Sequence, residues 1–124
     1  MIGLTRVTLR LGRNPAAGFP EGDDHIGYVI FAPLDADLML DAELWRSHRA
    51  ECTVRRFRAG EPAADGWLRH RGDNWFFWYD EADEGPSEDV ERLGAHRLAV
   101  GEYITIHEGG AEPMTYRVAE AVRV

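Results

Sequence analysis

The C-terminal third of the chain carries the pattern that most restricts its fold. Two adjacent glycines, Gly109 and Gly110, separate two segments in which apolar residues recur at every second position. Because a period of two places side chains on one face of a strand, and Gly-Gly is a tight-turn signal, this pattern predicts a β-hairpin. Glu120 interrupts the alternation. The apolar residues at even spacing are Ile104, Ile106, Met114, Tyr116, Val118, Val122 and Val124.

Five further segments have the composition of short strands. Leu4–Leu11 alternates and predicts a half-buried strand, whereas the nearly continuous apolar run His25–Ala32 is typical of a central strand covered on both faces. The segment Asn14–Asp24 between them contains two prolines and two glycines and predicts a loop. The other three strand-like segments are Cys52–Arg58, Trp67–His70 and Trp75–Tyr79, and the last two flank a turn and predict a second hairpin.

Only one segment favours a helix. The residues from Asp35 onward are good helix formers, and we predict a helix over about Asp41–Arg49 with Asp41 or Asp35 as its N-cap. A start near Ala36 is the alternative. If the helix persisted beyond its predicted end, it would place three side chains on one face, namely Trp45, His48 and Cys52.

These elements together predict a mainly β chain that forms a single domain over residues 1–124. We expect a small antiparallel β-barrel or a strongly curved sheet of about six or seven strands, with the one short α-helix covering an open end. Closure into a barrel is favoured because it leaves few unpaired strand edges.

The net charge of −8 and the pI of about 5.0 describe an acidic protein. Such a field repels nucleic acid and anionic membranes, so neither is expected as a partner. All fourteen basic residues are arginine, and the absence of lysine excludes Schiff-base catalysis and a phosphate-loop lysine. No run of about 20 apolar residues is present, and arginines interrupt the start of the chain. We therefore expect a soluble protein located in the cytoplasm.

Charge is unevenly distributed along the chain. Leu44–Arg71 contains seven arginines and three acidic residues, whereas Asp80–Glu91 contains seven acidic residues and no basic one. Runs of like charge are usually solvated, so the acidic segment is interpreted as a solvated loop. The alternatives are that it screens the arginine-rich segment, or that the arginine-rich segment binds an acidic partner or ligand.

Five consecutive aromatic residues form the predicted strand at 75–79. Alternation sends Trp75, Phe77 and Tyr79 to one face and Phe76 and Trp78 to the other. An aromatic row in water would bind a partner or a planar ligand, and an arginine on the preceding strand could stack on it. The alternative is that the strand lies at the centre of the core with both faces covered. The candidate binding residues are Trp75, Phe77, Tyr79, Trp78, Arg69 and Arg71.

Catalytic and metal-binding patterns are weak. No two histidines have the spacing that places two metal ligands on one helix or strand face, so no metal site is predicted from His25, His48, His70, His96 and His107. His25 does lie beside Asp23 and Asp24. Cys52 could form a thiolate pair with His48 or His70, but a lone cysteine is more commonly a small buried hydrophobe.

Two functional hypotheses follow. The favoured one is a small binding or interaction module that uses the aromatic strand and its arginines to bind an unidentified protein or small molecule, or to form a homodimer. The other is a small enzyme with a histidine and carboxylate site at the barrel mouth, with or without a metal, in which Glu120 is the best candidate for a buried carboxylate. No catalytic residue is assigned and no cofactor is expected, because no catalytic or phosphate-cradling glycine motif is present.

Overall fold

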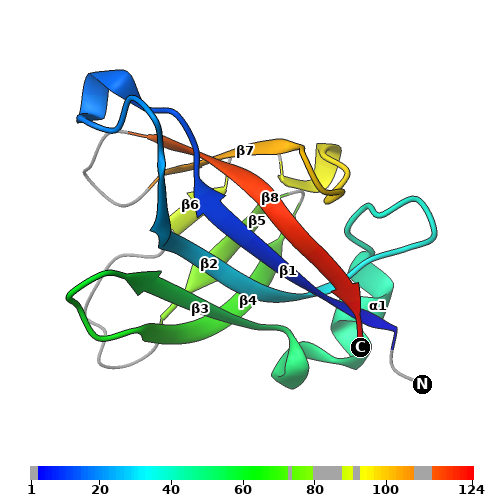
Figure 1. Cartoon of the computed structure of the whole chain (residues 1–124). Coiled ribbons are helices and arrows are strands. Elements are labelled where there is room, and N and C mark those ends of the chain that lie inside the picture. The colour runs from blue at the N-terminus through cyan, green and yellow to red at the C-terminus, as the bar shows by residue number, and fades with distance from the viewer. Residues whose placement is uncertain (1–2, 73, 80–87, 91–92, 108–112) are drawn as a thin grey trace.

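The computed structural model describes residues 3–72, 74–79, 88–90, 93–107 and 113–124. Within them lie one α-helix, α1 (Ala42–Ser47), and eight strands: β1 (Leu4–Leu11), β2 (Asp23–Pro33), β3 (Thr53–Arg58), β4 (Ala64–Arg71), β5 (Asn74–Trp78), β6 (Glu88–Val90), β7 (Tyr103–His107) and β8 (Met114–Arg123). Each strand pairs antiparallel with the next, and β8 returns to pair with β1, so the sheet closes into a barrel (Figure 1). The predicted mainly β fold is confirmed.

The prediction of six or seven strands missed β6. Its three residues lie inside the acidic segment that we interpreted as a loop, yet they pair with β5 on one side and with β7 on the other. Residues 80–87 of that segment lie outside the described residues, as does the Gly109-Gly110 turn. The hairpin pairing of β7 with β8 is nevertheless present, as is that of β4 with β5.

The strand β8 contains a bulge that corrects the expected position of Glu120. Val118 pairs with Leu9 of β1, but Glu120 pairs with the adjacent residue Thr8, so Ala119 is an extra residue on β8. An extra residue shifts the alternation of every side chain after it. Val118 is therefore fully buried, whereas Glu120 is exposed rather than on the apolar face.

The barrel interior is filled by side chains from alternate strand positions, as a small barrel requires. At its centre the ring of Tyr28 packs against those of Phe77 and Tyr116, with centroids 5.2 and 5.1 Å apart. All three side chains are fully buried. Near this point β1 and β2 approach so closely that a Cβ on Gly27 would collide with the carbonyl oxygen of Leu9, so this position requires glycine.

The helix α1 begins where one of the two predictions placed it and ends earlier. Asp41 is the N-cap, and its Oδ1 accepts hydrogen bonds from the backbone N–H groups of Glu43 and Leu44 at 3.0 and 3.2 Å. The start near Ala36 is wrong. Helical geometry is lost at His48, where φ is −134°, and a 3-10 turn, Arg49–Glu51, follows. The expected common face of Trp45, His48 and Cys52 is therefore broken.

The side chain of Trp45 holds α1 against the barrel. It is buried, and its Nε1 donates a hydrogen bond to the carbonyl oxygen of Leu68 in β4 at 2.8 Å. Its ring makes edge contacts with those of His70 and Trp75. Figure 1 shows α1 beside the end of the barrel where β8 ends and β1 begins. No helix among the described residues is long and apolar enough to cross a membrane.

Removing the N-cap should cost a measurable part of the stability. We expect Asp41→Ala to lower the free energy of unfolding by about 1 kcal/mol, because two backbone N–H groups at the start of a short helix lose their acceptor. Urea denaturation followed by circular dichroism measures this loss. Asp41→Asn is the matched control, since asparagine is an equally good N-cap. An equal loss in both variants would contradict a capping role.

Candidate functional site

The aromatic strand β5 has one set of rings inside the barrel and one outside. Trp75 and Phe77 are 6% and 0% exposed, whereas Trp78 is 40% exposed and Phe76 is half-buried on the outer face. The outward row is therefore Phe76 and Trp78, and the alternative in which both faces of the strand are covered is wrong, because Trp78 is exposed. Tyr79 follows the end of the strand and packs, half-buried, against the core.

Two arginines of β4 lie over the outer rings of β5. The guanidinium carbon of Arg69 is 4.7 Å from the ring centroid of Trp78, and that of Arg71 is 5.4 Å from the ring centroid of Phe76. The stacking expected for these arginines is present. Trp67, which pairs with Trp78 across the two strands, places its ring centroid 6.0 Å from that of Trp78.

Two more arginines, from the end of α1 and the turn after it, lie near Arg69 and Arg71. Arg46 in the last turn of α1 and Arg49 in the following 3-10 turn line a pocket together with Arg69 and Arg71. The guanidinium carbon of Arg49 lies 4.7 Å from the ring centroid of the buried Trp45. This arginine pocket has a volume of about 470 Å³, and its lining is completed by Trp45, His70, Gly72 and Phe76. The sequence indicated the excess of arginine but not this convergence.

The four guanidiniums of the arginine pocket have no carboxylate partner in the described part of the chain. The ion pairs found there join His25 to Asp23, His48 to Glu51 and Arg55 to Asp65. Arg55, by contrast, has a carboxylate partner. Its hydrogen bond to Asp65 holds the pKa of the Asp65 carboxyl below its usual value. Arg46, Arg49 and Arg71 are exposed, and like charges on one surface repel one another, so an anion bound among them would be favoured electrostatically.

A second depression lies further along the outer face of the barrel. It has a volume of about 490 Å³, crosses β1 to β4 and includes Phe31, Trp67 and the Arg55–Asp65 ion pair in its lining. Its lining contains two arginines, Arg6 and Arg55, and Arg55 is already paired with Asp65, so this depression offers less unpaired positive charge than the arginine pocket. Trp67 lines this depression and contacts Trp78, over which Arg69 of the arginine pocket lies.

Cys52 does not form a thiolate pair. Its side chain is fully buried, and burial, with a smaller contribution from Glu51, raises the pKa of its thiol to about 12. The thiol is therefore protonated at neutral pH, which removes the thiolate hypothesis and supports the interpretation as a small buried hydrophobe.

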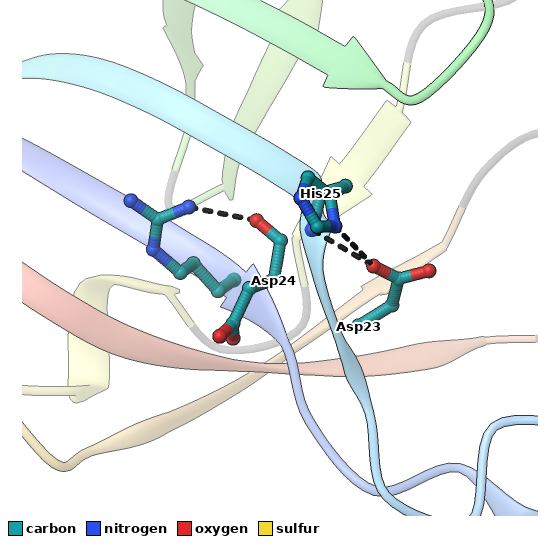
Figure 2. A network of polar contacts seen from close by, with 4 residues as sticks. Asp23, Asp24 and His25 are labelled. Carbon is teal, nitrogen blue, oxygen red and sulfur yellow. Dashed lines mark hydrogen bonds and ion pairs between the residues drawn. The ribbon is translucent and has the colours of Figure 1, made fainter.

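The histidines are dispersed over the barrel. Figure 2 shows His25 beside Asp23, whose Oδ1 lies 3.4 Å from the imidazole Nδ1 and accepts a hydrogen bond from the backbone N–H of His25. Asp24 contributes only its backbone oxygen, to Arg10, and the His25 side chain is 81% exposed. Within the described residues, no three His, Cys, Asp or Glu side chains gather at metal-binding distances.

Two members of the candidate binding set, Trp75 and Phe77, thus belong to the core, while Arg69, Arg71 and Trp78 lie together on the outer face. Arg46 and Arg49, which line the same pocket, were not among the sequence-based candidates. Comparison of the chain with protein-family models, with curated proteins and with solved structures finds no match.

Proposed function

We propose that the chain is a binding module whose site is the arginine pocket together with the adjoining outer face of Trp78. The observation that carries the proposal is that four arginines, without a described carboxylate partner, line one pocket in a chain whose net charge is −8. In an acidic protein, such a local reversal of charge favours an anionic ligand or an acidic partner.

Stacking on aromatic rings restrains three of the pocket arginines before a ligand binds. Arg49, Arg69 and Arg71 each lie over a ring, so their positions are restrained before any ligand arrives. Stacking uses the face of a guanidinium and leaves the N–H groups at its edge free to donate to an oxyanion. Less conformational entropy is then lost on binding than with four mobile side chains.

A homodimer through this face is a weaker candidate. A two-fold interface centred on the arginine pocket would bring the four arginines of both copies close together, and like charges across an interface repel. The enzyme hypothesis has no supporting observation among the described residues, because Glu120 is exposed, Cys52 is protonated and His25 stands at the surface.

Retention on phosphocellulose at low salt tests the proposed function. We expect the chain to be retained despite its net negative charge, because the arginine pocket presents its positive groups together. The double variant Arg69→Ala/Arg71→Ala should elute without delay. The matched control is Arg13→Ala/Arg123→Ala, which removes the same charge from exposed positions outside the pocket. Equal elution of the two variants would show that net charge alone governs retention.

A further inference from the structure

We infer that the ligand of the arginine pocket is a small compound that carries two or more linked phosphate groups. This inference rests on the proposed binding function and specifies the ligand class. It is drawn from the number of guanidiniums, their distribution over two walls, and the size and opening of the pocket.

The arginines form two pairs on separate elements. Arg46 and Arg49 belong to the end of α1 and the 3-10 turn after it, whereas Arg69 and Arg71 are two residues apart on the outer face of β4. Residues at that spacing on a strand lie about 7 Å apart. Each pair can therefore hold its own anionic group, and one ligand with linked groups can bridge both walls.

Phosphate fits this charge better than carboxylate does. A phosphate group carries between one and two negative charges near neutral pH and offers three acceptor oxygens, whereas a carboxylate carries one charge and two oxygens. Four arginines along one pocket of about 470 Å³ therefore favour an anion of high charge density. Guanidinium edges bind phosphate oxygens through paired hydrogen bonds, which adds geometric selectivity to the charge attraction.

The pocket has the size and access that a small ligand needs. Its volume lies within the usual range for small-molecule sites, roughly 300 to 1,000 Å³. Gly72, which also lines the pocket, has a φ of +62°, and a Cβ there would meet no atom of the described residues within 4 Å. His70 packs on Trp75 with ring centroids 4.3 Å apart, which fixes another part of the lining.

Isothermal titration calorimetry with inorganic triphosphate tests the inference. We expect one site per chain, with triphosphate binding more than about tenfold tighter than orthophosphate, because only the linked anion reaches both walls. The variant Arg46→Ala/Arg71→Ala, which removes one arginine from each wall, should lose about tenfold or more in affinity. The control Arg13→Ala/Arg123→Ala should retain the affinity of the unmodified chain.

A lysine variant separates charge from geometry. Arg46→Lys/Arg71→Lys keeps the charge but lacks the paired donors, so its affinity should fall between those of the unmodified chain and the alanine variant. It also guards against misfolding of the alanine variant, and thermal melts of both variants verify the fold. Equal affinities for the lysine variant and the unmodified chain would contradict recognition by the guanidinium edges.

Other outcomes would overturn the inference in distinguishable ways. If triphosphate and orthophosphate bind equally, the requirement for linked phosphate groups fails. If the tricarboxylate tricarballylate binds as tightly as triphosphate, the preference for phosphate over carboxylate fails. In either case, phosphocellulose retention still supports an anion-binding site. If an oligothymidylate of about 12 nucleotides binds far more tightly than triphosphate, the partner is single-stranded nucleic acid. Loss of both triphosphate binding and retention would remove the proposed function as well.

Discussion

Truncation of Trp75 to alanine is expected to lower the free energy of unfolding by about 3–5 kcal/mol. The side chain is 6% exposed, and its ring packs against Trp45 and His70 with centroids 5.9 and 4.3 Å away. Its removal would leave a cavity between the barrel and α1 that the closed sheet cannot easily collapse to fill. Urea denaturation of the purified variant measures the loss.

Trp78 is the matched control on the same strand. Its ring is 40% exposed and lies on the outer face, so Trp78→Ala should cost about 1 kcal/mol or less. Trp78→Ala should weaken ligand binding more than Trp75→Ala does, because Arg69 loses the ring over which it lies. Equal losses of stability in the two variants would contradict the assignment of Trp75 to the core and Trp78 to the surface.

The second large expected effect is a loss of folding stability at alkaline pH, caused by the buried thiol of Cys52. Burial raises the thiol pKa from 9.0 to about 12, so between these pH values the unfolded chain releases a proton that the folded chain keeps. The free energy of unfolding must then fall as pH rises, by up to about 1.4 kcal/mol per pH unit. We expect a contribution of about 2 kcal/mol to be lost between about pH 8 and 10.5.

The comparison of Cys52→Ala with the unmodified chain isolates this contribution. Tyrosine and arginine titrations are common to both chains, so they cancel in the difference between the two pH profiles. The alanine variant should be less stable at pH 7, because Cys52 is fully buried, but its stability should decline less steeply above pH 9. Parallel profiles would show that the thiol titrates alike in the folded and unfolded chains.

The sequence predicted the strands wherever a period of two or an aromatic run was long enough to stand out. The first strand, Leu4–Leu11, has the predicted bounds, and both hairpins pair as expected. The three residues of β6 could not be predicted, because their pairing depends on neighbours 11 to 18 residues away rather than on a local pattern. The bulge at Ala119 likewise depends on the register against β1.

The site could be predicted only in part. Arg69 and Arg71 were candidates because they precede the aromatic strand, and both lie over its outer rings. The inner and outer rings of β5 could not be distinguished, since both alternating sets are aromatic. Arg46 and Arg49 join the pocket because the hydrogen bond from Trp45 to Leu68 holds α1 against β4, and no sequence pattern encodes that tertiary contact.

The shortest strand, β6, also affects whether strands of other chains can pair with this sheet. Without β6, both β5 and β7 would present rows of unpaired backbone N–H and C=O groups, and exposed edges of that kind recruit strands from other chains into aggregates. A segment of three residues, two of them acidic, thus completes the ring by pairing at two positions with β5 and at two with β7. The acidic run that we interpreted as a solvated loop therefore contributes the strand that protects the barrel from edge-to-edge association.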